Sequence, residues 1–221
     1  MADQYIPKAF GVDIIRNFGP TIVKTELPQE MVDDLNKDCS DILDSKKEKT
    51  DWSDDLAGRV EDEFLISADV LTKYNTYIAA VASRLLFPTE KEFELNKDKF
   101  QAGVNSGWYV RQYESDYNPR HWHTGCQISC VGYLKLPEDY EETQKIESQD
   151  HNPAMGYITF HYGSMLLTNI NNMKFEPKVG DFYMFPSWLE HSVNPFRSKY
   201  KAPDPKGERR SFSMNVIFRN T

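Results

Sequence analysis

The sequence predicts a mainly β fold of the α+β kind, a sandwich or jelly roll with helices at its N-terminal end. The first observation is that, from about residue 104, apolar residues recur with a period of two in short runs separated by Gly, Pro, Asn and Asp. The second is that the period before that point is helical. Many short strands with no helices between them favour a jelly roll over a doubly wound parallel sheet.

Two segments of the first half are expected to be helices. Residues 27–47 place apolar side chains on one helical face: Met31, Leu35, Cys39 and Ile42. Residues 67–88 begin with Ser67 as a candidate N-cap, repeat apolar residues at helical spacing and stop at Pro88. The stretch between them, residues 51–67, is polar and irregular, so we expect a loop there.

The predicted strands are rich in β-branched and aromatic residues. Their runs read "WYVRQY" (108–113), "CQISCVGYLKLP" (126–137), "GYITFHYG" (156–163), "GDFYMFP" (180–186) and "SFSMNVIF" (211–218). No repeat or low-complexity linker divides the chain, so residues 1–221 are expected to form a single domain. In this interpretation residues 1–100 are a mostly helical support region and residues 101–221 are the β body.

Charge and composition limit the possible binding partners and the cellular compartment. The net charge of −8 and pI near 5.2 argue against nucleic acid or an anionic membrane as a partner, since both attract a basic surface. No segment has the pattern of a signal peptide or a membrane span. The three cysteines form no CxxC pair, which is typical of a reducing cytoplasmic setting. Nothing in the sequence indicates an oligomeric state.

The strongest chemical signal is a set of three histidines. His121 and His123 stand two apart in "PRHWHTGCQ", after one predicted strand and just before the next, and His191 follows a Gly-Asp turn and another predicted strand. A His-x-His pair alone could be two surface imidazoles. With a third, distant histidine the pattern indicates a metal site, since imidazole binds iron, zinc, copper or nickel. Three ligands on one side of the ion, with open positions opposite, suit non-haem Fe(II) and oxygen chemistry.

The last predicted strand carries a second signal. Its alternation places polar side chains on one face (Arg209, Ser211, Ser213 and Asn215) and apolar side chains on the other (Phe212, Met214, Val216 and Phe218). A guanidinium beside serine hydroxyls can bind both oxygens of a carboxylate. The alternative is a solvent-facing strand with a surface salt bridge. Arg210 begins the apolar face and is the weaker candidate.

These motifs together resemble the 2-oxoglutarate- and Fe(II)-dependent oxygenases, and within them a small prolyl-hydroxylase-like branch found in phages and bacteria. The resemblance rests on "HWHTG", "GYLKLP", "GDFYMFPSWLEHSVNPF" and "ERRSFSMN", and it covers residues 105–219. It implies a double-stranded β-helix fold. It also implies Fe(II) as the metal, 2-oxoglutarate and O2 as co-substrates, and hydroxylation of a prolyl or other protein side chain or of a small molecule. If the chain is viral, the host cytoplasm is its expected location.

The resemblance also implies roles for single residues. His121 and His191 match the first and last iron ligands, and Arg209 matches the base that pairs with the distal carboxylate of 2-oxoglutarate, with Ser211 beside it. Tyr113 stands where prolyl hydroxylases have a tyrosine lining the co-substrate pocket. Tyr133 matches another tyrosine that bonds the same carboxylate, and its strand face carries the more polar residues, so it is expected to point inwards.

His123 departs from the family, which has a carboxylate at this position. Three interpretations stay open. The imidazole of His123 is itself the third ligand; or His123 is the first ligand and Gly125 takes the carboxylate position, as in iron halogenases; or a remote acid or water completes the site.

Two other classes of protein share parts of the pattern. A cupin metalloprotein has a His-x-His pair, but its motif has a Glu three or four residues after the pair, where this chain has Cys126 and Gln127. An arginine that binds a carboxylate, the role expected of Arg209, has no function in a cupin. A non-catalytic jelly-roll protein, such as a binding or virion component, would not need the two histidine regions to converge.

Overall fold

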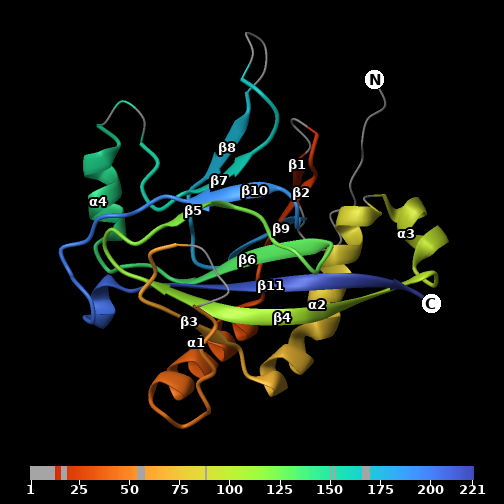
Figure 1. Ribbon diagram of the computed structural model, residues 1–221, viewed down its shortest axis with the longest axis horizontal. Helices are drawn as coiled ribbons and strands as arrows, with labels where there is room; N and C mark the ends of the chain where they lie inside the picture. Colours follow the sequence, from red (N-terminus) through yellow and green to blue (C-terminus); the bar gives the residue numbers. More distant parts are fainter. Residues whose placement is uncertain are drawn as a thin grey trace.

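The computed structural model describes residues 13–15, 19–53, 58–87, 89–149, 151, 153–165 and 170–221. Two antiparallel sheets lie over one another, and the helices lie mainly on the far side of the larger sheet (Figure 1). The larger sheet has the strand order β1 (Asp13–Ile15), β2 (Ile22–Glu26), β9 (Asp181–Pro186), β6 (Ile128–Lys135), β11 (Arg209–Asn220), β4 (Phe100–Gln112) and β3 (Asp62–Leu65). The smaller sheet has the order β5 (Asn118–His121), β10 (Glu190–Val193), β7 (Ile158–His161) and β8 (Asn172–Phe175). The predicted fold class is confirmed.

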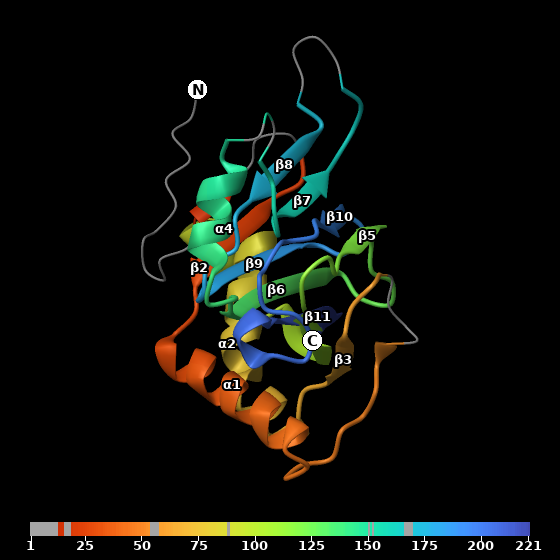
Figure 2. The same cartoon turned by 90° about the vertical axis from the view of Figure 1, so that its left-hand side faces the viewer.

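Two long helices cover the outer face of the larger sheet, α1 (Gln29–Leu43) and α2 (Ala68–Leu86) (Figure 2). The apolar face predicted for the first helix is buried. It packs with the outward-facing side chains of the sheet, among them Tyr109, Phe182, Phe212 and Met214. Ser67 occupies the N-cap position of α2, although its side chain makes no capping hydrogen bond there. None of the helices in the described part of the chain combines the length and apolarity needed to cross a bilayer.

The part of the chain expected to be mostly helical, residues 1–100, also contributes strands to the larger sheet. Strands β2 and β3 both come from the part expected to be mostly helical, and β3 comes from the expected loop, residues 51–67. β2 pairs with β9 and β3 pairs with β4, so both parts of the chain contribute to one sheet. β3 has only four residues and begins with two acids, and its strand conformation is held by the longer β4 beside it.

Two short helices complete the fold, α3 (Glu90–Asn96) and α4 (Tyr140–Glu147). α4 lies in the polar segment between two strands of the body, and α3 links α2 to β4. A capping box starts α3, in which the backbone N–H of Glu92 donates to the Thr89 hydroxyl and the backbone N–H of Thr89 donates to the Glu92 carboxylate.

The inner face of the larger sheet positions the candidate site. Strand register aligns Glu63, Val110, Ser211 and Tyr133 in one row across β3, β4, β11 and β6. The next row consists of Leu65, Trp108, Ser213, Val131 and Tyr183. Residues of these two rows face the smaller sheet because side chains two apart on a strand share a face.

Candidate metal centre and co-substrate pocket

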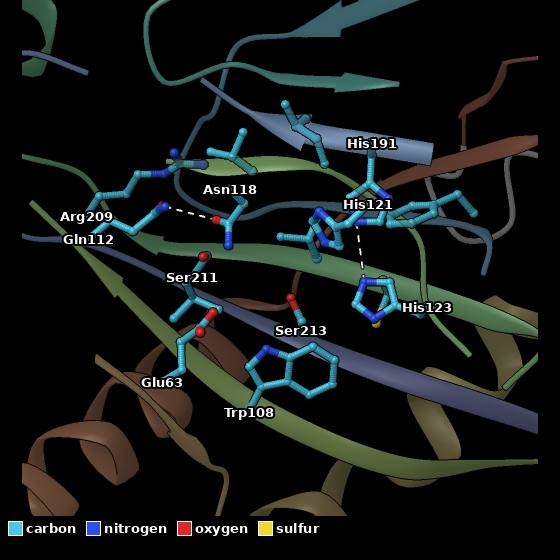
Figure 3. A pocket seen from close by; sticks show the side chains of 16 residues that line it. Glu63, Trp108, Gln112, Asn118, His121, His123, His191, Arg209, Ser211 and Ser213 are labelled. Atoms are coloured by element: carbon cyan, nitrogen blue, oxygen red, sulfur yellow. Dashed lines mark hydrogen bonds between the residues drawn. The ribbon is translucent and has the colours of Figure 1, made fainter. Parts of the chain in front are cut away.

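The three histidines converge at the mouth between the two sheets (Figure 3). Antiparallel pairing of β5 with β10 places His121 directly opposite His191. His123 follows the end of β5, where its backbone N–H donates to the Ser187 carbonyl at 2.9 Å. One ligand atom from each imidazole can be chosen so that all three lie within 4.8 Å of one another. Residues from distant parts of the chain therefore form one cluster, as predicted.

Two backbone carbonyls fix the orientation of two of the rings. The Nδ1–H of His121 donates to the Pro119 carbonyl at 2.7 Å, and the Nδ1–H of His191 donates to the Leu189 carbonyl at 2.9 Å. Each ring therefore carries its proton on Nδ1 and leaves the Nε2 lone pair for a metal. The Nε2 atoms of His123 and His191 lie 3.3 Å apart.

That separation fits a shared metal ion. Two nitrogens bonded to one ion at about 2.1 Å each lie about 3.0 to 3.4 Å apart when the angle between the bonds is near 90° or tetrahedral. The rings are also partly screened from water: Phe185 packs edge-on against His191 with ring centroids 4.7 Å apart, and Trp108 packs against His123 at 5.7 Å. The donor set thus suits a metal that accepts imidazole ligands.

Burial keeps the cluster in the form that binds metal. It lowers the pKa of His121, and it lowers the pKa of His123 to about 4 with help from the neighbouring His121. Burial and the other two histidines hold the pKa of His191 well below its usual value. All three imidazoles are therefore neutral at neutral pH, and a neutral imidazole is the state that ligates a metal.

The geometry favours one of the three interpretations of His123. Since His121 lies in the cluster, a frame in which His123 is the first ligand and Gly125 replaces the carboxylate leaves His121 without a role. Within the part of the chain that the structure describes, no carboxylate joins the group. A site of three histidines is the arrangement that remains supported.

Arg209 lies in the same pocket and is almost completely buried. Only 1% of its surface is exposed, and its Nε and Nη1 find no hydrogen-bond partner in the described part of the chain. The guanidinium carbon lies 5.2 Å from the centre of the Tyr133 ring, and the buried Tyr133 hydroxyl also has no partner. Buried polar groups almost always have partners, so these donors are available to an anionic ligand, of which a carboxylate is one kind.

The neighbours of Arg209 match the clamp that the sequence predicts. Ser211 is buried, lines the pocket and lies opposite Tyr133 in the register of β11 and β6. Burial raises the pKa of Tyr133, so its hydroxyl keeps the proton that it can donate to an anion. Arg210 points to the other face, where its guanidinium bonds the Glu208 carboxylate, so it is not available to a ligand.

Tyr113 lies outside this pocket, contrary to the expectation from the resemblance. Its hydroxyl accepts a hydrogen bond from Arg111 at 3.1 Å and lies 3.5 Å from the Pro203 carbonyl. The inward position at this end of β4 belongs to Gln112, which is paired with Arg209 in the register and donates to the Asn118 side chain at 3.0 Å. The difference has a simple cause, because neighbouring residues at the end of a strand point in opposite directions.

The pocket contains residues that sequence reasoning missed. Glu63 and Trp108 line it together with Gln112, Asn118, the three histidines and Arg209 (Figure 3). Glu63 stands in residues 51–67, whose polar and irregular pattern predicts a loop. The apolar run that follows it, Phe64, Leu65 and Ile66, is too short to predict a strand.

The sequence of the β body also matches a family of oxygenases. Residues 106–215 match the model of a family described as "Putative 2OG-Fe(II) oxygenase". A search of curated proteins finds no significant match.

Solved structures show the same fold at low sequence identity. The non-haem α-ketoglutarate-dependent epimerase SnoN from nogalamycin biosynthesis superposes with a TM-score of 0.54 at 15% identity, over 89% of this chain and 77% of that chain. A prolyl hydroxylase from Trichoplax adhaerens, in complex with a hypoxia-inducible-factor peptide, gives a TM-score of 0.51 at 12% identity, over 95% and 84%. A prolyl-4-hydroxylase from Pseudomonas putida gives 0.48 at 16% identity, over 96% and 94%. The fold is that of the double-stranded β-helix oxygenases.

The family match covers the strands that carry the histidine cluster and the buried arginine, and oxygenases of this family use Fe(II), 2-oxoglutarate and O2. Neither a cupin nor a non-catalytic jelly-roll protein is favoured by this match. The β body of the chain, over residues 106–215, thus matches the family of 2-oxoglutarate- and Fe(II)-dependent oxygenases.

Proposed function

We propose that His121, His123 and His191 hold the Fe(II), and that Arg209, with Ser211 and Tyr133, binds the distal carboxylate of 2-oxoglutarate. One observation carries the proposal. A three-imidazole cluster and a buried guanidinium, whose Nε and Nη1 have no hydrogen-bond partner among the described residues, line the same pocket. The first is a set of metal ligands and the second is a receptor for an anion, and the family uses both kinds of ligand together.

Bound Fe(II) and 2-oxoglutarate supply oxidative decarboxylation of the co-substrate, coupled to hydroxylation of the substrate. The residues of this chain bind and orient. The carbonyls of Pro119 and Leu189 hold two imidazoles in position, and the planar fork of Arg209 sets the direction from which the co-substrate approaches. Aromatic walls keep water away from the reacting centre, which suppresses side reactions.

His123 changes the charge of the site. An imidazole ligand is neutral, whereas the carboxylate that it replaces carries one negative charge. The three-histidine site therefore leaves one more unit of positive charge on a bound Fe(II). This strengthens its attraction for the anionic end of 2-oxoglutarate.

The substrate that we propose is a protein side chain, prolyl or another, or a small molecule. Two structural neighbours set this range. The Trichoplax enzyme is described in complex with a peptide, and SnoN is described as an epimerase of nogalamycin biosynthesis. The acidic balance of the chain argues against nucleic acid as the substrate.

Anaerobic titration of the protein with Fe(II), with and without 2-oxoglutarate, tests the assignment. We expect a weak visible metal-to-ligand absorption band that needs both additions, and a loss of that band in Arg209→Ala at the same 2-oxoglutarate concentration. A protein without the band would contradict the metal site, and a band unchanged in Arg209→Ala would contradict the clamp. Succinate formation under air then gives the turnover with peptide and metabolite mixtures.

A further inference from the structure

Glu63 belongs to the wall of the proposed active-site pocket although it comes from the edge strand β3. Its register partner on β4 is Val110, and Val110 pairs in turn with Ser211 on β11. Glu63 therefore lies in the same inward-facing row as the residues beside Arg209, and it lines the pocket with them (Figure 3). Its neighbour Phe64 faces the opposite way, into the core beneath the helices.

The Glu63 carboxylate is buried without a counter-charge. The residue is 4% exposed, and none of the described residues gives its carboxylate a hydrogen bond or an ion pair. The adjacent acid, Asp62, takes both nearby cations, Lys49 and Arg111. A carboxylate removed from water without a partner is costly, and buried acids in proteins are normally paired.

The surroundings of Glu63 raise its pKa to about 7, first through burial and then through the negative charges of Asp51 and Asp62. Among the described residues, no cation lowers the pKa of Glu63 in return. A positively charged ligand would supply the missing partner and restore the ionised form of the carboxylate.

The same pocket also holds an unpaired charge of the opposite sign. Arg209 and Glu63 both line it, yet they form no ion pair, and Arg209 retains unpartnered donors. Two opposite charges kept apart in one pocket fit two ligands of opposite charge. The proposed co-substrate accounts for the arginine and leaves the carboxylate for the substrate.

We propose that Glu63 binds a cationic group of the substrate, an ammonium or a guanidinium, beside the metal centre. This proposal rests on the proposed function and narrows it to substrates that carry a basic nitrogen, such as a lysyl or arginyl side chain or an amine metabolite. Glu63 is then the residue that selects the substrate by charge.

The test compares probes that differ only in charge. Capped tripeptides with a central lysine or arginine are titrated into the anaerobic Fe(II)–2-oxoglutarate protein, alongside tripeptides with norleucine, citrulline or glutamate. Binding is followed by calorimetry and by perturbation of the metal-to-ligand band. We expect at least one cationic tripeptide to bind about tenfold or more tightly than its neutral counterpart, since hydrogen bonds between charged groups are the strong ones.

Two variants distinguish binding by the Glu63 carboxylate from attraction by the negative charge of the protein surface in general. In Glu63→Gln the preference for the cationic peptide should fall to less than about twofold, while the band of the probe-free complex stays intact. Asp51→Asn removes the same charge from an exposed neighbour outside the pocket and should retain the preference.

The outcomes distinguish this proposal from the function on which it rests. A missing metal-to-ligand band in the wild-type protein counts against the oxygenase site itself. A normal band with equal or no binding of cationic and neutral tripeptides overturns the role of Glu63, and so does a preference that survives in Glu63→Gln.

Discussion

Arg209 is one of two adjacent arginines, and the two serve opposite faces of the same strand. Because the orphaned donors of Arg209 form a planar fork, Arg209→Lys should keep the charge yet lose the two parallel hydrogen bonds to a carboxylate. We expect the affinity for 2-oxoglutarate to fall about 10- to 100-fold. Calorimetry on the Mn(II)-loaded protein measures it. Arg210→Lys is the matched control and should leave this affinity unchanged, because Arg210 bonds Glu208 on the outer face.

His123 is the residue at which this chain departs from its family. If its imidazole is a ligand, His123→Ala should weaken Fe(II) or Co(II) binding by at least about tenfold, while His123→Asp should keep or improve it by restoring a carboxylate. The control is His161→Ala, since the His161 ring lies 3.0 Å from the Ser192 hydroxyl and outside the cluster. Equilibrium dialysis against a competing chelator gives the affinities. Metal binding that is indifferent to His123→Ala would exclude the three-histidine site.

Glu63 should also lower the stability of the unliganded protein. Its carboxyl has a pKa of about 7 in the folded state and an ordinary value of 4.5. The folded protein therefore binds more protons than the unfolded chain between these values, and stability falls as pH rises from 4.5 to 7. Glu63→Gln should be no more stable at pH 4.5 but more stable by up to about 3 kcal/mol at pH 8. Urea unfolding at both pH values checks this; a difference that does not change with pH would contradict it.

At the scale of elements, Glu208 joins three strands. Its carboxylate accepts hydrogen bonds from Arg111 on β4, Arg210 on β11 and Lys135 on β6, while Arg210 also reaches the Asn36 carbonyl on α1. Burial by itself would raise the pKa of Glu208, but the charges and hydrogen bonds of Arg210 and Arg111 outweigh it and lower the pKa to about 2. The cluster therefore holds the sheet and its helical cover together at the end nearest Arg209.

The sign of the pH effect at Glu208 is opposite to that at Glu63. A carboxyl whose pKa is lowered on folding stabilises the protein above its unfolded value of 4.5, and this contribution disappears as pH falls towards 2. Glu208→Gln should cost about 3 kcal/mol at pH 7 and progressively less below pH 4.5. Urea unfolding from pH 3 to 7 measures the difference. Glu94→Gln, in an exposed pair with Lys97, should change stability little at any pH.

The helices and strands differ in how clearly the sequence predicts them. The two long helices and the strands β4, β6, β7, β9 and β11 repeat apolar residues over several positions, so the sequence predicts them. It does not predict the short strands β5, β8 and β10. β3 was missed because four residues that begin with two acids resemble a loop, and only pairing with β4 makes them a strand. The start of α3 carried a readable signal in Thr89 and Glu92, the pair that forms its capping box.

The residues of the candidate site also differ in how well the sequence predicts them. The sequence predicts His121, His123, His191 and Arg209 because their side-chain chemistry is distinctive. It does not predict β5 and β10, the short polar strands that carry His121 and His191. Tyr113 was placed inwards by the resemblance alone, and the strand end turned it outwards. Glu63 could not be predicted, because its role depends on which strand lies beside β4, and that is a property of tertiary pairing and not of local pattern.

At the scale of the whole molecule, the two sheets share the proposed site. His121 and His191 lie on the smaller sheet, whereas Arg209 and Ser211 lie on the larger one. A metal on the histidines and a co-substrate that reaches Arg209 would therefore link the two layers. Ligands that bind only the folded state stabilise it by mass action, so occupancy of this site should be visible in the unfolding of the entire domain.

Thermal unfolding with Mn(II) and 2-oxoglutarate tests this link. At a ligand concentration about 100 times the dissociation constant the gain is about 2.7 kcal/mol, which corresponds to a rise in Tm of roughly 5 to 10 °C for a domain of this size. We expect 2-oxoglutarate to add to the metal's effect in the wild-type protein but not in Arg209→Ala. His191→Ala should lose both increments, because His191 is the buried centre of the cluster. Glutarate has the same five-carbon chain and distal carboxylate but lacks the 2-oxo group that chelates the metal, so it should raise Tm less. Equal shifts from glutarate and 2-oxoglutarate would mean that the carboxylate site and the metal site are not spanned by one ligand, and would contradict the arrangement across the two sheets.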